Sequence, residues 1–241
     1  MCIRDRSTGN YNPRTARLYT DLSHLTADAS ITTDMEHVFV HLAGQSRLQP
    51  LSRLWMAPFH LHRKLIARID ALGEAARKGE STRIVAKMNS LTDEALIHSL
   101  MRAGADGVQI DLIVRGACML PAQVPGQTDN IRVRSVIGRF LEHSRVFYFR
   151  QGEGEELYLS SADWMNRNMV RRVELAWPVT DPVLRQRIVD ECLVAYLHDG
   201  VDAWELGGDG RYQRVQARRA GQPAHGVQAA LMARYARNDK G

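Results

Sequence analysis

The chain has 241 residues, of which 44% are hydrophobic and 24% are charged, and these proportions are typical of a folded globular protein. They exclude a disordered, collagen-like or disulfide-scaffold chain. No segment approaches the ~20 consecutive apolar residues that a membrane span needs. Three widely spaced cysteines without a CxxC pair, and a start that lacks a secretory signal, fit a reducing cytoplasm, with association at a membrane surface left open.

The net charge of +5 is concentrated near the carboxyl terminus. Residues 211–241 carry seven Lys or Arg and one Asp, which leaves the preceding 210 residues at −1. We interpret this basic tail as a solvated extension, and contact with a polyanion is the alternative.

Hydrophobic periodicity predicts helices and strands that alternate along the chain. In chain order we expect helices over 33–42 and 61–76, a strand over 83–88, a helix over 92–103, a strand over 108–114, a helix over 135–141, strands over 145–149, 156–160 and 171–179, and helices over 181–197 and 223–237. The first two of these strands and the helix between them form a β-α-β unit, and Gly152 and Gly154 indicate a hairpin. The glycine and prolines of 43–58 indicate a domain junction in an α/β chain.

Several familiar catalytic motifs do not occur in the sequence. It has no P-loop, no GxGxxG fingerprint, no GxSxG elbow and no HExxH pair. His37 and His41 lie four residues apart on a predicted helix but lack a third ligand, so we expect no metal site there. Nucleotide-binding and zinc enzymes of the common types are therefore disfavoured.

Three segments combine Gly, Arg, His, Ser or Asn at the ends of predicted elements. They are residues 8–12 with Tyr19, Arg115 after the 108–114 strand, and 142–145 followed by 160–164. Arginine offers a planar donor fork for phosphate oxygens, and histidine exchanges a proton near neutral pH. The loop that begins at Arg115 lies at the carboxyl end of a strand, where open α/β sheets bind their ligands. These segments predict a phosphate site.

The same segments carry a family resemblance. The motifs Thr-Gly-Asn-Tyr-Asn (8–12), Thr-Ala-Arg-Leu-Tyr-Thr-Asp (15–21), Leu-Thr-Ala-Asp (25–28), Leu-Ile-Val-Arg-Gly (112–116), Asp-Asn-Ile-Arg (129–132), Phe-Leu-Glu-His (140–143) and Tyr-Leu-Ser-Ser-Ala-Asp-Trp-Met (158–165) resemble the carboxyl-terminal part of type 1 polyphosphate kinases. The resemblance extends from about Ser7 to about Val215. It implies two phospholipase D-like α/β domains in tandem, each a mixed sheet flanked by helices. Residues 1–53 would end the first domain and 54–241 would form the second, nearly complete one.

The resemblance also implies a reaction and its participants. Enzymes of this family transfer the γ-phosphate of ATP reversibly to inorganic polyphosphate, with magnesium, through a phosphohistidine. Tyr19, Arg115 and His143 match positions that contact ATP, and His143 is also expected to be catalytic, by protonating or orienting the leaving oxygen. Lys87 is a further candidate for a phosphate contact. The expected partners are ATP or ADP, inorganic polyphosphate and a second copy of the chain, but not nucleic acid.

The departures from the family pattern limit what the chain is expected to do alone. The phosphorylated histidine of the family lies in a His-x-Lys motif before the 8–12 segment, as do the magnesium ligands, and only seven residues precede that segment here. We therefore expect an amino-terminally truncated fragment that does not turn over. Arg145 and Arg150 replace the lysine and aspartate of a phospholipase D-type motif, so hydrolysis is not expected either. A non-catalytic module that binds polyphosphate or RNA is the alternative.

Overall fold

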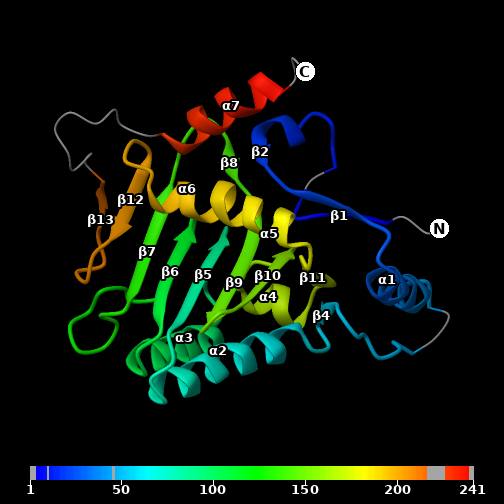
Figure 1. Cartoon of the computed structure of the whole chain (residues 1–241), viewed down its shortest axis with the longest axis horizontal. Helices are drawn as coiled ribbons and strands as arrows, with labels where there is room; N and C mark the ends of the chain where they lie inside the picture. Colours follow the sequence, from blue (N-terminus) through cyan, green and yellow to red (C-terminus); the bar gives the residue numbers. More distant parts are fainter. Residues whose placement is uncertain (1–3, 10, 45–46, 216–225, 239–241) are drawn as a thin grey trace.

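The computed structural model describes residues 4–9, 11–44, 47–215 and 226–238 (Figure 1). Its centre is a nine-stranded sheet of order β13-β12-β7-β6-β5-β9-β10-β11-β4. These strands are β4 (Trp55–Ala57), β5 (Thr82–Met88), β6 (Gln109–Val114), β7 (Ile131–Val136), β9 (Arg145–Gln151), β10 (Gly154–Ser160), β11 (Glu174–Pro178), β12 (Ala203–Leu206) and β13 (Tyr212–Arg214). Strands β5, β6 and β7 are parallel and their neighbours are antiparallel, so the sheet is mixed.

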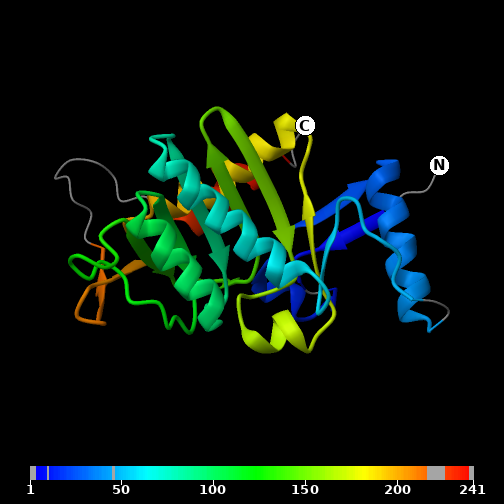
Figure 2. The same cartoon turned by 90° about the horizontal axis from the view of Figure 1, so that it is seen from below.

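Helices cover both faces of this sheet, which confirms the expected α/β architecture (Figures 1 and 2). One face packs on α2 (Leu61–Arg77) and α3 (Glu94–Ala105), and the other on a continuous helix formed by α5 (Pro182–Ile188), η2 (Val189–Val194) and α6 (Ala195–Leu197). Alternate residues of one strand enter the two cores, because successive side chains of a strand point to opposite faces. Ile84 joins the α2–α3 core, for example, and Val85 joins the other.

The predicted β-α-β unit is confirmed as β5, α3 and β6. Lys87 pairs with Ile113 in the parallel register, so the carboxyl ends of β5 and β6 lie at one edge of the sheet. Helix α3 begins after Asp93, whose carboxylate accepts a hydrogen bond from the Leu96 N–H at 3.0 Å. The helix therefore begins at Glu94, two residues after the predicted start at residue 92. This edge of the sheet carries Arg115.

The helix predicted over 135–141 is wrong. Residues 131–136 form β7, in which Ile131 and Val133 are buried against the α2–α3 core while Arg132 and Arg134 point to the opposite face. This alternation has the two-residue period of a strand, and it overrides the apolar spacing that suggested a helix. A two-residue strand, β8 (Leu141–Glu142), follows instead.

The amino-terminal part is a separate layer at one end of the sheet (Figure 1). It contains β1 (Arg4–Ser7) paired with β3 (Ser23–Thr26), the short η1 (Ala16–Leu18), β2 (Tyr19–Thr20) and α1 (Ala29–Leu42). Helix α1 starts four residues before the predicted position because Asp28 caps it. Buried Asp34 of α1 accepts hydrogen bonds from the N–H groups of residues 52–54, which anchors the chain just before β4. The division of the chain at residue 53 stays a prediction.

The carboxyl-terminal helix α7 (Val227–Asn238) packs on the rest of the fold. Its first residues Val227 and Gln228 are buried, and Asp199 accepts a hydrogen bond from the Val227 N–H at 2.7 Å. The interpretation of the basic tail as a solvated extension is therefore wrong for α7, while residues 216–225 and 239–241 lie outside the described part. Among the described residues, no helix combines the length and apolar character that crossing a bilayer requires.

Candidate functional site

Two short strands bring the amino-terminal layer to the edge of the sheet. Strand β2 pairs in parallel with β8, with Tyr19 opposite Leu141 and Thr20 opposite Glu142. This pairing places the rings of Tyr19 and His143 with their centroids 5.0 Å apart. Two of the residues that the sequence selected, from segments far apart in the chain, are thus neighbours.

The imidazole of His143 is bound at both nitrogens. Its Nδ1 lies 2.9 Å from the carboxylate of Asp21, and its Nε2 lies 3.0 Å from a terminal nitrogen of Arg145. A guanidinium can only donate hydrogen bonds, so Nε2 accepts from Arg145. The proton of the neutral ring therefore lies on Nδ1 and is donated to Asp21.

A continuous set of hydrogen bonds links this histidine to Arg115. Arg145 forms a two-pronged ion pair with buried Asp163, with N–O distances of 2.8 and 3.1 Å. Asp163 accepts from the backbone N–H of Asn89 at 2.6 Å, and the Asn89 side-chain oxygen accepts from Nε of Arg115 at 2.6 Å. Arg115 and His143 belong to different strand ends, but one network holds both.

Gly9 gives this network its close packing with the amino-terminal layer. A Cβ at this position would collide with Nδ1 of His143 and with the Asp21 carboxylate. Thr8, which is fully buried, donates its hydroxyl to Asp21 at 3.0 Å, and its carbonyl oxygen accepts from Arg145 at 3.0 Å. The Thr-Gly pair therefore fits directly against the histidine.

Lys87 lies next to this site in the interior of the protein. Its ammonium is 2.7 Å from Glu142 and 3.5 Å from the ring centroid of Tyr196. Burial disfavours the charged ammonium, but the Glu142 carboxylate outweighs this effect and raises the pKa of Lys87 above its usual range. Burial likewise opposes the charge on Glu142, yet Lys87 and the hydrogen bonds from Gln228 and Thr20 bring its pKa below the usual range.

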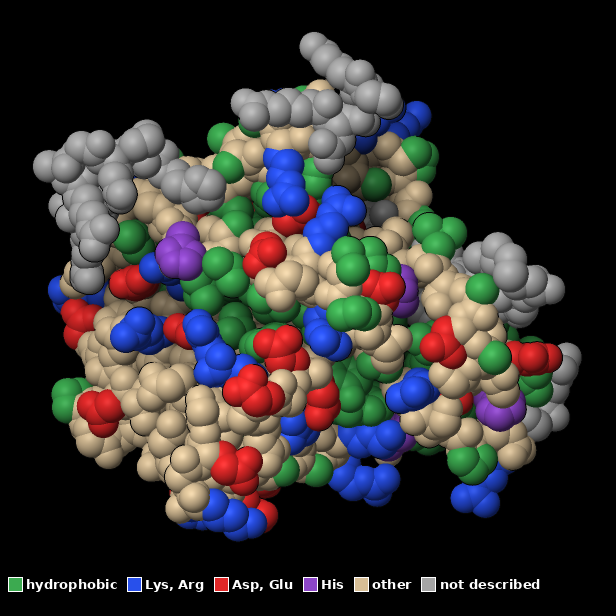
Figure 3. Space-filling view, in the orientation of Figure 1, with side chains coloured by type: hydrophobic (Ala, Val, Ile, Leu, Met, Phe, Trp, Pro, Cys, Tyr) green, Lys and Arg blue, Asp and Glu red, His purple; other side chains and the backbone are tan. Residues whose placement is uncertain are grey.

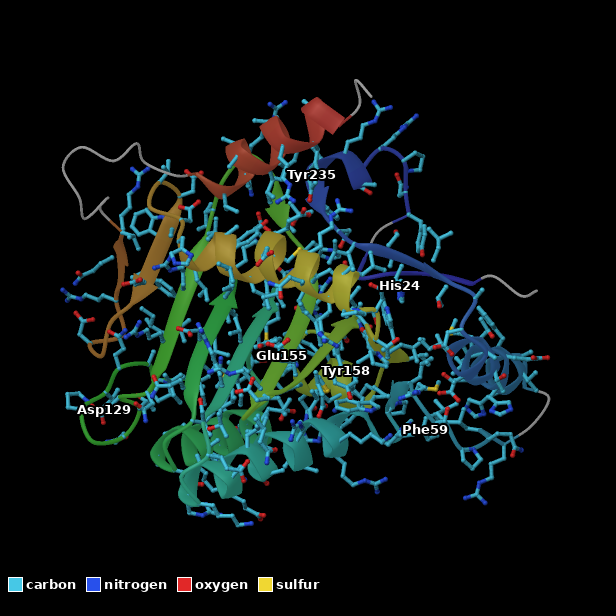
Figure 4. The ribbon with its side chains drawn as sticks, in the orientation of Figure 1. His24, Phe59, Asp129, Glu155, Tyr158 and Tyr235 are labelled. Carbon is cyan, nitrogen blue, oxygen red and sulfur yellow. The ribbon has the colours of Figure 1, made fainter. Side chains whose placement is uncertain are left out.

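A cavity of about 290 Å³ opens between β2, the α5–α6 helix and α7. Its lining is mostly apolar and aromatic and consists of Tyr19, Thr20, Asp21, Leu22, Lys87, Phe140, Ser144, Cys192, Tyr196, Gln228, Leu231, Met232 and Tyr235. Figure 3 shows hydrophobic and basic side chains next to each other in the region between α7 and the α5–α6 helix. Figure 4 places Tyr235 on α7 at this cavity, and its hydroxyl donates to Glu191 at 2.5 Å.

His, Cys, Asp and Glu side chains are the usual protein ligands of metal ions. Within the described ranges, no group of three or more His, Cys, Asp and Glu side chains is arranged to hold a metal ion. His37 and His41 do not belong to such a group.

Sequence reasoning found some of these residues and missed others. Tyr19, His143 and Arg115 were selected by their residue type and position, and the network joins the last two. Asp21 and Asp163 were inside the quoted motifs, but nothing in the sequence assigned them as partners of His143 and Arg145. Asn89, after β5, and the residues of α7 carried no signal of their own.

Two family models match the chain. The model named "Polyphosphate kinase C-terminal domain 2" matches residues 54–226, and "Polyphosphate kinase C-terminal domain 1" matches residues 3–48. The chain belongs to the polyphosphate kinase family. The first of these matches alone covers more than half of its length.

Individual members of the polyphosphate kinase family agree with this assignment. The polyphosphate kinases of Paraburkholderia phytofirmans and Burkholderia vietnamiensis are 50% and 49% identical to the chain over 228 residues, which are 95% of this chain and 33% of each relative. The crystal structure of polyphosphate kinase from Porphyromonas gingivalis aligns with a TM-score of 0.91 and 37% identity, over 98% of this chain and 36% of that one. The chain therefore spans about a third of the length of the curated relatives it matches.

Proposed function

We propose that this chain forms the nucleotide- and phosphate-binding end of an ATP:polyphosphate phosphotransferase, which moves the γ-phosphate of ATP reversibly to inorganic polyphosphate. The observation that carries the proposal is the network from His143 through Arg145, Asp163 and Asn89 to Arg115, which adjoins the cavity behind Tyr19. Membership of the polyphosphate kinase family supports the choice of substrates.

The two ends of the site suit the two parts of a nucleotide. The aromatic and apolar lining of the cavity, including Tyr19, suits a planar base. Within the described part of the chain, the Arg115 side chain is bound to Asn89 through Nε only, and its two terminal nitrogens are available there for phosphate oxygens. Preorganised donors of this kind stabilise the negative charge of a phosphoryl group in transfer.

His143 would assist the leaving oxygen by proton transfer. In the arrangement described here its Nε2 lone pair accepts from Arg145, so it has no proton to give at that atom. An acid role requires a second proton on Nε2, which in turn requires that the Arg145 N–H move away. Asp21 would stabilise the resulting imidazolium through Nδ1.

Other participants of the reaction lie beyond these residues. In this proposal the histidine that becomes phosphorylated is upstream of the chain, so the chain by itself is expected not to turn over. Magnesium, when bound, would neutralise phosphate charge, but the described side chains do not form a ligand set for it and we route no step through it. Assembly with a second copy of the chain also stays a prediction.

A second candidate is a module that binds polyanions without catalysis, and a groove on the far side of the α5–α6 helix favours it. The groove has a volume of about 410 Å³, and Arg83, Arg132 and Arg134 are among its lining residues. Arg83 and Arg134 are paired with acidic side chains, whereas Arg132 forms no ion pair with a described carboxylate. The excess positive charge is small, so we rank this function second.

The two functions are separated by binding and by activity. We expect calorimetry to detect MgATP binding to the 241-residue chain, and we expect Tyr19→Ala and Arg115→Gln each to weaken it about tenfold, a loss typical of one charged hydrogen bond or one aromatic contact. The same substitution at exposed Arg172, Arg172→Gln, is the control. Polyphosphate binding that is salt-sensitive and independent of ATP, without MgATP binding, would favour the module.

Activity is tested by restoring an upstream segment that carries the His-x-Lys motif. We expect the extended protein to form polyphosphate from ATP and the His143→Ala variant of it to lose most of this activity. Full activity of the 241-residue chain would contradict an upstream nucleophile. A folded extended protein without activity would contradict the phosphotransferase.

A further inference from the structure

Gln228, the second residue of α7, is 5% exposed and makes three hydrogen bonds to the segment that precedes His143. Its side-chain oxygen accepts from the N–H of Phe140 at 2.9 Å, and its amide nitrogen donates to the Phe140 carbonyl at 2.9 Å and to Glu142 at 2.5 Å. Gly138 leaves room for it, since a Cβ there would lie 2.5 Å from the Gln228 oxygen. The side-chain oxygen and the amide nitrogen of Gln228 are therefore both hydrogen-bonded, as buried polar groups require.

Glu142 connects the Gln228 contact with the site around His143. Its carboxylate accepts from Gln228 of α7, from Lys87 of β5 at 2.7 Å and from the hydroxyl of Thr20 of β2 at 2.8 Å. His143 is the next residue, and its N–H donates to the Thr20 hydroxyl at 3.3 Å. One carboxylate therefore joins four segments immediately before the histidine.

We propose that Gln228 is a positioning residue that, by holding Phe140 and Glu142, fixes the backbone from which His143 reaches Asp21. This inference rests on the proposed function for what His143 does, but its geometry stands without it. The match to the family's second carboxyl-terminal domain ends at residue 226, just before α7, so that match assigns no role to Gln228.

A carboxyl group in place of the amide distinguishes positioning from simple packing. In Gln228→Glu the shape is kept, but an ionised carboxylate would face Glu142 and the Phe140 carbonyl, where the amide donated. Two carboxylates that share a site raise the pKa of one of them. At low pH the new group is protonated and can donate to Glu142 as the amide does. The hydrogen bond from residue 228 to Glu142 is thus lost at high pH and restored at low pH.

Four ionisable groups next to this contact keep their charge between about pH 5.5 and 7.5. Histidines titrate in that range, so each variant is compared with wild type at the same pH. The four groups are Glu142 of β8, to which the Gln228 amide donates, and Lys87 of β5, Cys192 of η2 and Tyr196 of α6, which line the same cavity as Gln228. Lys87 has a raised pKa, as does Tyr196 chiefly through burial, and burial raises the pKa of Cys192 to about 11, while that of Glu142 is lowered. None of these four changes its charge in that range.

The experiment follows the His143 ring directly in the 241-residue chain. Nitrogen-15 histidine spectra give the ring signals, and the signal missing from His143→Ala identifies residue 143. For Gln228→Glu at about pH 7.5 we expect a shifted His143 signal and an MgATP affinity about tenfold below that of wild type at the same pH. At about pH 5.5 the signal should return to the wild-type position and the affinity to within about twofold of wild type. Gln213→Glu, the same change on exposed β13, is the control and should match wild type at both pH values.

Two further results decide the outcome. Gln228→Leu, which keeps the volume but has no polar group, should shift the His143 signal at both pH values, and it replaces Gln228→Glu if that variant unfolds at high pH. Wild-type His143 signals in both folded variants at both pH values would overturn the inference. If the wild-type chain does not bind MgATP, the proposed function fails, while the His143 signals still decide whether Gln228 positions this ring.

Discussion

Asp21 and His143 follow two strands that pair in parallel, and the Asp21 carboxylate lies 2.9 Å from the Nδ1 of His143. Asp21 also accepts a hydrogen bond from the hydroxyl of Thr8, which helps to fix the orientation of its carboxylate. A carboxylate in this position selects the tautomer of a histidine and stabilises its protonated form. The amino-terminal layer thus contributes an orienting group to a histidine of the main sheet.

Replacement of this carboxylate should weaken nucleotide binding. We expect Asp21→Asn to lower the affinity for MgATP about tenfold, close to 1.4 kcal/mol, because the neutral amide loses a charged hydrogen bond to His143. Titration calorimetry of the 241-residue chain measures the effect. The control is Asp129→Asn in the distant loop labelled in Figure 4, and equal affinities for the two variants would contradict an orienting role for Asp21.

A methyl group at Gly9 should disturb the same contact from the other side. We expect Gly9→Ala to lower the free energy of unfolding by about 1–3 kcal/mol, because its Cβ would press on His143 and Asp21. Gly226→Ala is the matched control, since its Cβ would meet Val201 at an ordinary 3.5 Å. Urea denaturation gives both values, and similar losses would mean that the close approach at Gly9 carries no cost.

The buried pair of Arg145 and Asp163 is a contact that arginine can make and lysine cannot make in full. The guanidinium reaches Asp163 twice and the Thr8 carbonyl once, which a single ammonium cannot do. We expect Arg145→Lys to lower the free energy of unfolding by about 3 kcal/mol, because part of a buried charge loses its partner. Arg102→Lys, at an exposed pair with Asp70, should cost less than about 1 kcal/mol. A small loss at Arg145 would show that lysine can replace it.

Local patterns predicted the elements whose hydrophobic period was unambiguous. The α2 helix and the β5-α3-β6 unit followed from such patterns, because the helices bury one face each and the two strands are apolar runs that are buried on both faces. The 131–136 strand is not predicted, because Arg132 and Arg134 interrupt its apolar pattern, and a helix over 135–141 is expected in this region instead. These arginines face a groove beside the sheet, and only the pairing of β7 with β6 accounts for them.

The candidate site was harder to predict because its contacts join distant segments. Residue type and strand ends pointed to His143 and Arg115 separately, but no local rule links them. Asn89 and Gln228 act through backbone and side-chain amides that resemble ordinary loop or helix residues in the sequence. Their roles follow from the meeting of β5, β8 and α7 in space, which depends on the whole sheet.

The Lys87–Glu142 pair should be costly to break on one side only. We expect Lys87→Met to lower the free energy of unfolding by about 3–5 kcal/mol, since it leaves the Glu142 carboxylate buried without its cation. In the double variant Lys87→Met/Glu142→Gln no buried charge remains, so a large part of that loss should return. Denaturation midpoints of both variants decide the point. A double variant as unstable as Lys87→Met would show that packing around Lys87, rather than the charge, sets the cost.

The Glu142 carboxylate should make the free energy of unfolding depend on pH in the acidic range. Burial raises the pKa of Glu142, but Lys87 and the surrounding donors outweigh this and leave it below its ordinary value of 4.5. A lowered folded-state pKa contributes stability that is fully present above about pH 4.5 and is lost as the pH falls through the lowered value. The free-energy difference between wild type and Glu142→Gln should therefore be constant above about pH 5.5 and narrow below about pH 4.5. Glu153→Gln, in an exposed turn, should show no such change, and a difference for Glu142→Gln that stays constant into acid would place the pKa of this carboxyl at its unfolded value.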